Sequence, residues 1–356
     1  MLTADTVEVE ARTNDHRGLS HIWEIDFFWI DAQLLVYVKK LGPTRFGPPK
    51  MKPPPFRYHD PKTVNEAVGL LASLENAKLL AGGQSLMPML NMRFVLPDHI
   101  IDLNRVEGLS YIREAKGALE IGAMTRQRDL EFSDAVRVRW PIMHEALLQV
   151  GHRQTRNRGT IGGSLCHLDP AAELVSLATG YDATVTVVGP NGERELPFAE
   201  FPVAYMTPAI ELNELVVGVR FPQWTAKHGY AFVEFSRRHG DFAITSAAVL
   251  LEGDASGKIT RASVTIGGMG TAPSRAREVE QAIVGQLPAG TLFRDACESC
   301  RKLEANDDVH APASYRQHLA AVLSRRALEK AHARLLEAHA GRPHSERQWE
   351  RSGKLR

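Results

Sequence analysis

Apolar positions along the chain recur at two spacings, one typical of helices and one typical of strands. Residues 64–71 carry apolar side chains at helical spacing. Thr63, with Glu66 three residues later, matches a capping box and predicts that a helix begins there. Residues 78–81 form a short apolar run that ends at a Gly-Gly pair, which predicts a buried strand leading into a turn.

The middle of the chain alternates short strands with short helices. Period-two alternation predicts two hairpins, one about Lys116-Gly117 and one about Pro190-Asn191-Gly192. The same patterns predict strands at 99–106 and 214–222, and helices at 85–92, 125–132, 141–150 and 171–180. The arginine-rich stretch 151–159 predicts a basic loop between two of these helices.

The last third of the chain reads as strands followed by helices. Residues 230–252 give two strands, and 258–270 give a third with alternate apolar residues on one face. Helices are predicted at about 274–284, 290–304 and 313–337. Because regular strand–helix–strand spacing is missing throughout, the pattern favours an α+β fold over a doubly wound sheet.

The composition is that of an ordinary globular chain. Of the 356 residues, 44% are hydrophobic and 24% charged, and the net charge of +1 does not indicate nucleic-acid binding. Three cysteines are too few for a disulfide framework and fit a reducing compartment. Acidic residues interrupt the most apolar early stretch, 21–38, and the N-terminus lacks the features of a signal peptide. We therefore expect a cytoplasmic protein without a membrane span.

Two glycine-rich turns carry the candidate chemistry. Gly82-Gly83 follows the strand predicted at 78–81, and Gly162-Gly163 follows an RNRG sequence. Paired glycines allow positive φ and close approach to a ligand, and exposed amides in such a turn bind anions. Either turn alone is more often an ordinary tight turn, but the two together favour a pyrophosphate site. The four glycines would offer amides, and Ser85, Thr160 and Ser164 would offer hydroxyls.

Two further groups of charged residues have alternative interpretations. Glu173 follows the second glycine turn and could accept hydrogen bonds from a ribose diol, or it could be a solvated helix charge. The basic group Arg153, Arg156 and Arg158 could face the pyrophosphate or a partner, or be a solvated charge run.

Other motifs give little support for different chemistry. The sequence has no GxGxxG opening a βαβ unit, no GxxxxGK[ST], no HExxH and no cluster of histidines and cysteines for zinc. Cys297-x-x-Cys300 is interpreted as two helix residues rather than a redox pair. Cys166-His167 is a weak candidate for a nucleophile and base, because the side chains of sequence neighbours diverge. Gly267-Gly268 is interpreted as a structural turn.

The two glycine stretches, LLAGGQSLMPMLNMR (79–93) and RNRGTIGGSLCHLDPAAE (156–173), resemble the FAD-binding loops of one known family. This family is that of the FAD-binding medium subunits of molybdenum hydroxylases, which include xanthine dehydrogenase, carbon monoxide dehydrogenase and quinoline oxidoreductase. The resemblance extends over about 51–335 and includes IGAMTR (121–126), ELVVGVRFP, SRRHGDFA and the helix APASYRQHLAAVLSRRAL.

The resemblance implies an α+β chain with a two-subdomain FAD-binding fold of the vanillyl-alcohol oxidase (PCMH) type and a C-terminal domain with an antiparallel sheet and helices. The implied division is FAD-binding subdomains (51–106 and 107–223) and a C-terminal flavoprotein domain (228–337). The sequence itself predicts a poorly ordered extension (1–50), which has no counterpart in the family, and a basic tail (338–356). For the extension, a start codon chosen too far upstream is our hypothesis, and a pairing arm for a partner is the alternative.

The resemblance also implies which residues contact FAD, with none in a catalytic or metal-binding role. They are Leu79, Leu80, Ala81, Gly82, Gly83, Gln84, Ser85 and Leu86 in the first loop, Val150 and Gly151 beside the adenine or ribityl, Thr160, Gly162, Gly163, Ser164, His167, Asp169 and Glu173 in the second loop, and Val217, Asp241 and Phe242 near the flavin. Glu173 stands where the family often has Asp, and Phe242 replaces a Tyr or an aliphatic residue, so the flavin potential and its reoxidation rate could differ.

The implied role is electron transfer within a complex. A large subunit with molybdopterin would oxidise the substrate, and a small subunit with [2Fe-2S] clusters would pass electrons to this FAD and on to oxygen, NAD, a quinone or another acceptor. A dimer of heterotrimers is the implied assembly. Three cysteines are too few to hold one cluster by four thiolates. The alternatives are a stand-alone FAD-dependent reductase of the same fold and a non-enzymatic nucleotide-binding assembly protein.

Overall fold

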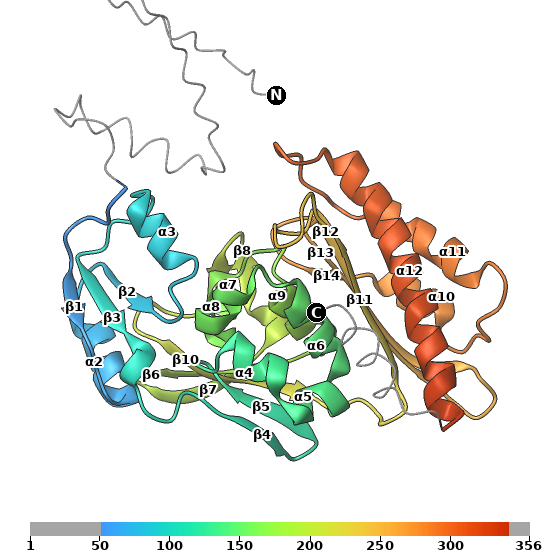
Figure 1. Ribbon diagram of the computed structural model, residues 1–356, viewed down its shortest axis with the longest axis horizontal. Coiled ribbons are helices and arrows are strands. Elements are labelled where there is room, and N and C mark those ends of the chain that lie inside the picture. Colours follow the sequence, from blue (N-terminus) through green and yellow to red (C-terminus); the bar gives the residue numbers. More distant parts are fainter. Residues whose placement is uncertain (1–50, 342–356) are drawn as a thin grey trace, which may run out of the picture. The chain divides into compact units, whose positions relative to one another are not determined.

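The structure is a computed structural model, and it describes residues 51–341 (Figure 1). The predictions for the extension 1–50, and for the basic tail beyond residue 341, lie outside this range.

The first part of the described chain is a small parallel sheet with a helix against it. Its strands are β1 (Arg57–His59), β2 (Ala77–Leu80) and β3 (His99–Asp102), in the order β1-β3-β2, and its helices are α2 (Val64–Ser73), α3 (Leu86–Asn91) and the 3-10 helix η1 (Leu103–Arg105). The predicted cap is confirmed, because the Thr63 hydroxyl accepts a hydrogen bond from the Glu66 amide at 3.2 Å. The carboxyl end of β2 leads directly into the first glycine loop, residues 81–85.

The second part is built on an antiparallel sheet that contains both predicted hairpins. Its strands are β4 (Ile112–Ala115), β5 (Ala118–Gly122), β6 (Thr184–Gly189), β7 (Gly192–Pro197) and β10 (Leu215–Pro222), in the order β4-β5-β10-β6-β7. Lys116 and Gly117 both have positive φ at the turn of the first hairpin. A short ribbon of β8 (Pro202–Ala204) and β9 (Thr207–Pro208) follows the 3-10 helix η2 (Phe198–Glu200).

The helices of this second part lie together on one side of its sheet (Figure 1). They are α4 (Gln127–Phe132), α5 (Asp134–Arg139), α6 (Pro141–Gln149), α7 (Arg153–Arg158), α8 (Ile161–His167) and α9 (Glu173–Gly180). Leucine, isoleucine and aromatic side chains from the helices and the sheet form the largest buried core of the described chain, including Trp140, Leu165 and Phe221. This packing fixes α8, and with it the second glycine pair.

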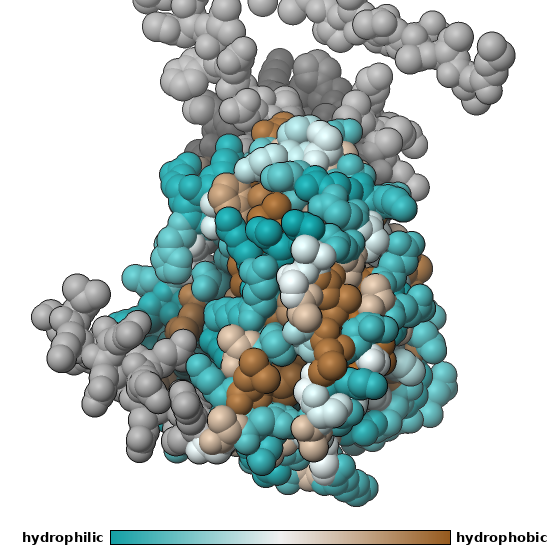
Figure 2. All heavy atoms as spheres, turned by 90° about the vertical axis from the view of Figure 1, so that its right-hand side faces the viewer, coloured by the Kyte–Doolittle hydropathy of each residue, from teal (hydrophilic) through white to brown (hydrophobic). Residues whose placement is uncertain are grey.

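The C-terminal part confirms the predicted order of strands and then helices. Its antiparallel sheet is β11 (Gly229–Phe235), β12 (Thr245–Gly253), β13 (Ile259–Gly267) and β14 (Ser274–Arg275), and its helices are α10 (Arg277–Ile283), α11 (Leu292–Cys297), the 3-10 helix η3 (Glu298–Lys302) and α12 (Ala313–His339). The sheet lies between α12 on one side and α6 and α9 on the other (Figure 1). The face bearing these C-terminal helices is mainly hydrophilic, with hydrophobic side chains in separate groups (Figure 2).

Several predictions of local structure are wrong. The strand predicted at 99–106 ends at Asp102 and is followed by η1, and the first residues of the helix predicted at 274–284 form β14. The stretch predicted as a basic loop contains helix α7, because Arg156 turns inward and pairs with Glu131 at 2.8 Å, where both side chains are largely buried. The second glycine pair is the first turn of α8 rather than a tight turn, and neither Gly162 nor Gly163 has positive φ. Charge and glycine content indicated loops, but tertiary packing determined helices.

Candidate functional site

The two glycine loops are in direct contact. A Cβ on Gly82 would clash with the carbonyl of Arg158 and lie 2.8 Å from the Cα of Gly159. Gly82 is therefore required for close approach between the loops, whereas Gly83 is required for its backbone conformation, with φ +72°. The structure thus brings together the two stretches that the sequence singled out, which are far apart in the chain.

The amides of the first loop are free to bind a ligand. Among residues 51–341, no acceptor pairs with the backbone N–H groups of Gly82, Gly83, Gln84 or Ser85. Consecutive unpaired N–H groups in an irregular loop form a concavity suited to an anion. Residues 81–83 and Ser85 are half-buried, so this concavity is partly shielded from water.

The second loop differs, because the chain itself uses its amides. The Gly162 amide donates to the Ala123 carbonyl at 2.8 Å, and the Gly163 amide donates to the Thr160 hydroxyl at 3.1 Å. A Cβ on Gly162 would lie 2.6 Å from the Cβ of Ala123. The prediction that Gly162 and Gly163 present free amides is therefore wrong in this structure, and the Ser164 hydroxyl remains the polar group of this loop available to a ligand.

Glu173 is buried at the start of α9, with 6% of its surface exposed, so the alternative of a solvated helix charge is wrong. Burial raises its pKa to about 8, and the charges of Glu234 and Asp169 contribute. Burial also lowers the pKa of His167, the last residue of α8, and raises that of Asp169 two residues beyond it. A ribose hydroxyl donating to Glu173 would favour the ionised form of this carboxyl.

Glu234 is a carboxyl near Glu173 that the sequence analysis did not identify. It lies on β11, in the C-terminal part of the chain, and its Oε2 has no hydrogen-bond partner among the described residues. Burial raises its pKa to about 7. No local spacing connects β11 with α9, so no sequence signal pointed to this pair.

The residues expected beside the flavin come from the second part of the chain and from the C-terminal part. Val217 lies at a bulge in β10, and its carbonyl accepts from the Ala123 amide at 3.0 Å. The Val150 carbonyl accepts from Arg156 at 3.0 Å, and Gly151 follows it with φ +43°. Phe242 is 63% exposed, so its ring is available to cover a ligand.

Three cysteines remain from the candidates that the sequence raised. Burial raises the pKa of Cys166 to about 12, which makes this thiol unsuited to act as a nucleophile. Cys297 and Cys300 are buried in the C-terminal core. Within residues 51–341, no group of three or more His, Cys, Asp or Glu residues could hold a metal ion. None of the helices in that range has the length and apolar character that crossing a membrane requires.

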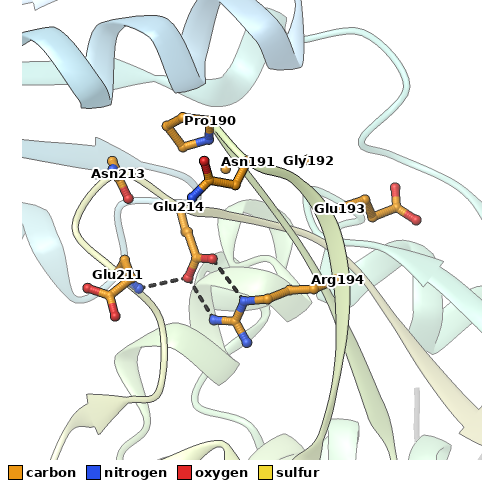
Figure 3. A pocket seen from close by; sticks show the side chains of 9 residues that line it. Pro190, Asn191, Gly192, Glu193, Arg194, Glu211, Asn213 and Glu214 are labelled. Carbon is orange, nitrogen blue, oxygen red and sulfur yellow. Dashed lines mark hydrogen bonds and ion pairs between the residues drawn. The ribbon is translucent and has the colours of Figure 1, made fainter.

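A cavity of about 370 Å³ lies at the β6–β7 hairpin (Figure 3). The Glu214 carboxylate in its wall is already paired, because both oxygens bond to Arg194, at 2.8 and 2.7 Å, and one accepts from the Glu211 amide at 2.8 Å. None of the glycine-loop residues lines this cavity, so it contributes nothing to the candidate site.

Comparison with family models matches nearly all of the described chain. Residues 54–224 match the FAD binding domain in molybdopterin dehydrogenase, and residues 230–331 match the CO dehydrogenase flavoprotein C-terminal domain. These two matches coincide with the glycine-loop part and the C-terminal part of the structure.

Curated relatives are similar over almost their full length. The 6-hydroxypseudooxynicotine dehydrogenase complex subunit alpha of Paenarthrobacter nicotinovorans is 40% identical over 298 residues, which cover 83% of this chain and 99% of the relative. The carbon monoxide dehydrogenase medium chain of Hydrogenophaga pseudoflava is 36% identical over 288 residues, covering 80% and 99%.

Solved structures show the same fold. Carbon monoxide dehydrogenase from Hydrogenophaga pseudoflava lacking the Mo-pyranopterin moiety matches with a TM-score of 0.77 and 37% identity, over 79% of this chain and 99% of the matched chain. Quinoline 2-oxidoreductase from Pseudomonas putida 86 matches with a TM-score of 0.76 and 31% identity, over 79% and 98%.

Proposed function

Because the chain belongs to the family of FAD-binding medium subunits of molybdenum hydroxylases, we propose that it relays electrons through its FAD from iron–sulfur clusters on a partner subunit to an external acceptor. The supporting observation is the contact between the glycine loops, with four unpaired amides on the first loop and the Ser164 hydroxyl on the second. This is the arrangement that a bound pyrophosphate requires.

The chain's residues fit FAD in a defined division of roles. The amides of residues 82–85 hold the pyrophosphate, and Ser164 adds a hydroxyl from the second loop. The buried carboxyl of Glu173 accepts from the ribose. Val217 and Phe242 would contact the flavin ring and restrict access of water to it. When bound, FAD supplies the redox chemistry, accepting and donating electrons.

Partner subunits supply the rest of the reaction. With three cysteines, this chain has too few thiolates for one four-cysteine cluster. The [2Fe-2S] clusters therefore belong to a small subunit, and a molybdopterin-containing large subunit oxidises the substrate, in a dimer of heterotrimers. Oxygen, NAD and quinones are the acceptor classes that this FAD could reduce.

The experiment is to purify the chain with its partner subunits and record its visible spectrum and its reduction by substrate. We expect a yellow flavoprotein that releases one FAD on denaturation and whose flavin is reduced by substrate only when both partners are present. Direct flavin reduction by NADH in the isolated chain would instead identify a stand-alone reductase. A colourless chain that takes up no added FAD would exclude both and leave an assembly protein.

A further inference from the structure

Arg126 bridges the two glycine loops with one guanidinium group. It lies at the N-cap of α4, and Nη1 donates to the Arg158 carbonyl in front of the second loop. Nη2 donates to the side-chain oxygen of Asn104 at 2.5 Å, and the Asn104 amide group donates to the Ala81 carbonyl in the first loop at 3.0 Å. A continuous series of hydrogen bonds therefore connects the loops.

The Arg158 carbonyl held by Arg126 is the group that Gly82 approaches. A Cβ on Gly82 would clash with this oxygen, so the position of the carbonyl determines how closely the loops approach. Arg126 donates a hydrogen bond to this same carbonyl oxygen. The separation of the loops, and with it the width of the anion site, depends on this contact.

Backbone hydrogen bonds tie the second loop to residues 123–127 but do not reach the first loop. The Ile161 amide donates to the Thr125 carbonyl at 3.1 Å, and the Gln127 amide donates to the Gly159 carbonyl at 2.8 Å. The connection to the first loop is made by the side chains of Arg126 and Asn104. A change in either side chain leaves these backbone bonds intact.

Asn104 suits this place because its side chain carries both an acceptor and a donor. Its side-chain oxygen accepts from Arg126, and its NH2 group donates to the Ala81 carbonyl. An aspartate at this position would place an oxygen against that carbonyl and lose the second hydrogen bond. Asp102 fixes Asn104 by accepting from its backbone amide at 2.9 Å, and the Tyr58 hydroxyl fixes Asp102 at 2.6 Å. The first-loop end of the bridge is therefore well supported.

Arg126 keeps its positive charge available. Among the described residues, no carboxylate forms an ion pair with it, and its hydrogen bonds go to neutral oxygens. Its guanidinium is partly buried and bonds to the Arg158 carbonyl, which Gly82 of the first loop also approaches. Asp102 and Asp129 act on the guanidinium from a distance, but a cation that no ion pair holds favours a dianionic pyrophosphate.

We propose that Arg126 is a positioning residue for FAD, which sets the spacing of the two glycine loops through Asn104 and the Arg158 carbonyl. This inference rests on the proposed function, because it takes the ligand between the loops to be FAD. The neighbouring Arg128 provides a matched control, since its guanidinium lies over the Phe132 ring, 4.6 Å from the centroid, and bonds to neither loop.

The test is an FAD titration of the full-length apoprotein, followed by flavin fluorescence, for the wild type and the variants Arg126→Met, Arg126→Lys, Asn104→Ala and Arg128→Met. We expect Arg126→Met to weaken FAD binding by about 10-fold or more, as for loss of hydrogen bonds from a charged donor. Arg126→Lys should fall between Arg126→Met and the wild type, because lysine keeps the charge but not the forked geometry. Arg128→Met should stay within about twofold of the wild type, because Arg128 makes no hydrogen bond to either loop.

A double-mutant cycle separates bridging from a general loss of structure. If Arg126 acts through Asn104, the double variant Arg126→Met/Asn104→Ala binds FAD no more weakly than Arg126→Met alone. Wild-type affinity in Arg126→Met, or fully additive losses in the double variant, would overturn the inference. Should Arg126→Met not fold, Arg126→Lys and Asn104→Ala decide it, and wild-type affinity in both is the overturning result. A wild-type chain that binds no FAD refutes the proposed function instead.

Discussion

The imidazole of His152 lies against the backbone of Gly240. An added Cβ on Gly240 would lie 2.7 Å from Nδ1 of His152, and Gly240 has φ +87°. His152 precedes α7, which leads to the second glycine loop, and Gly240 precedes Asp241 and Phe242 in the C-terminal part of the chain. This contact therefore connects the segment expected to cover the flavin with the part of the chain that holds the second loop.

Gly240→Ala should disturb the flavin environment as well as stability. The alanine clashes with His152 and adopts an unfavourable positive φ, which costs about 1–3 kcal/mol. We expect a lower melting temperature together with a changed rate of flavin reoxidation, measured by stopped-flow absorbance.

Gly257→Ala is the matched control, because Gly257 also has a positive φ, +85°, in the C-terminal part, but its Cβ would make only an ordinary contact at 3.5 Å. It should lower stability without changing reoxidation. Adding His152→Ala to Gly240→Ala should relieve the steric part of the loss. Equal reoxidation rates in the wild type and Gly240→Ala would show that the contact does not influence the flavin.

Gly82→Ala should reduce FAD retention strongly. The methyl group meets backbone atoms of Arg158 and Gly159, which cannot move aside as a side-chain end can. Strain of about 1–3 kcal/mol on the loop spacing would lower FAD affinity by roughly 5- to 150-fold. The ratio of flavin to protein absorbance after gel filtration measures this loss.

Gly69→Ala provides the comparison for Gly82→Ala. Gly69 lies in α2, and nothing lies within 4 Å of its Cβ position. Alanine there should stabilise the helix by up to about 1 kcal/mol and leave FAD content unchanged. Full flavin occupancy in Gly82→Ala would contradict the role that we give to the loop contact.

Glu173 should make the apoprotein less stable as the pH rises. Burial raises its pKa to about 8, so the folded state binds a proton more tightly than the unfolded state does. Its contribution is present at low pH and is lost as the pH rises from about 4.5 to about 8, by about 1.4 kcal/mol per unit of pKa difference.

The measurement is the melting temperature of apoprotein from pH 5 to pH 9 for the wild type and Glu173→Gln. Because glutamine does not titrate, the variant should gain stability relative to the wild type as the pH rises. The charges of Glu173 and Glu234 act on each other, so the difference between the two proteins reports the titration of this pair of carboxyls. Parallel curves would mean that Glu173 is ionised in the folded apoprotein throughout.

Glu145 should have the opposite pH dependence. This α6 carboxylate accepts from Arg334 at 2.6 Å, from Lys330 at 2.7 Å and from the Phe232 amide at 3.0 Å, joining α12 and β11 to the FAD-binding part. Burial alone would raise the pKa of Glu145, but the hydrogen bonds and charges of Arg334 and Lys330 outweigh it and hold that pKa below its usual range. The stabilisation by Glu145 is fully present above the pKa that this carboxyl has in the unfolded chain. It is lost as the pH falls through the lower pKa that the carboxyl has in the folded protein.

Glu145→Gln should lower the free energy of unfolding at pH 7 by about 2 kcal/mol, because it leaves Arg334 partly buried without its partner. The difference from the wild type should shrink at pH 3, as measured by urea unfolding. Glu329→Gln removes an exposed i,i+4 pair with Arg325 and should cost less than about 0.5 kcal/mol. Equal effects of the two substitutions would argue against the interdomain role of Glu145.

The sequence by itself determined the helices and strands that follow from the spacing of apolar residues, from a turn residue or from a capping residue. Alternation about Lys116-Gly117 and Asn191-Gly192 predicted both hairpins, and Thr63 with Glu66 predicted the start of α2. The Gly-Gly pairs also identified the two loops that the fold brings into contact. These features are encoded within a few residues, so a single sequence is enough to find them.

Only the tertiary structure decided which of these elements meet. The parallel order β1-β3-β2, the inward turn of Arg156 and the proximity of Glu173 to Glu234 depend on contacts between distant segments. The same is true of the Arg126 bridge. The sequence spacing of such residues does not encode their separation in space, because packing of the whole core determines which side chains are buried and what they contact.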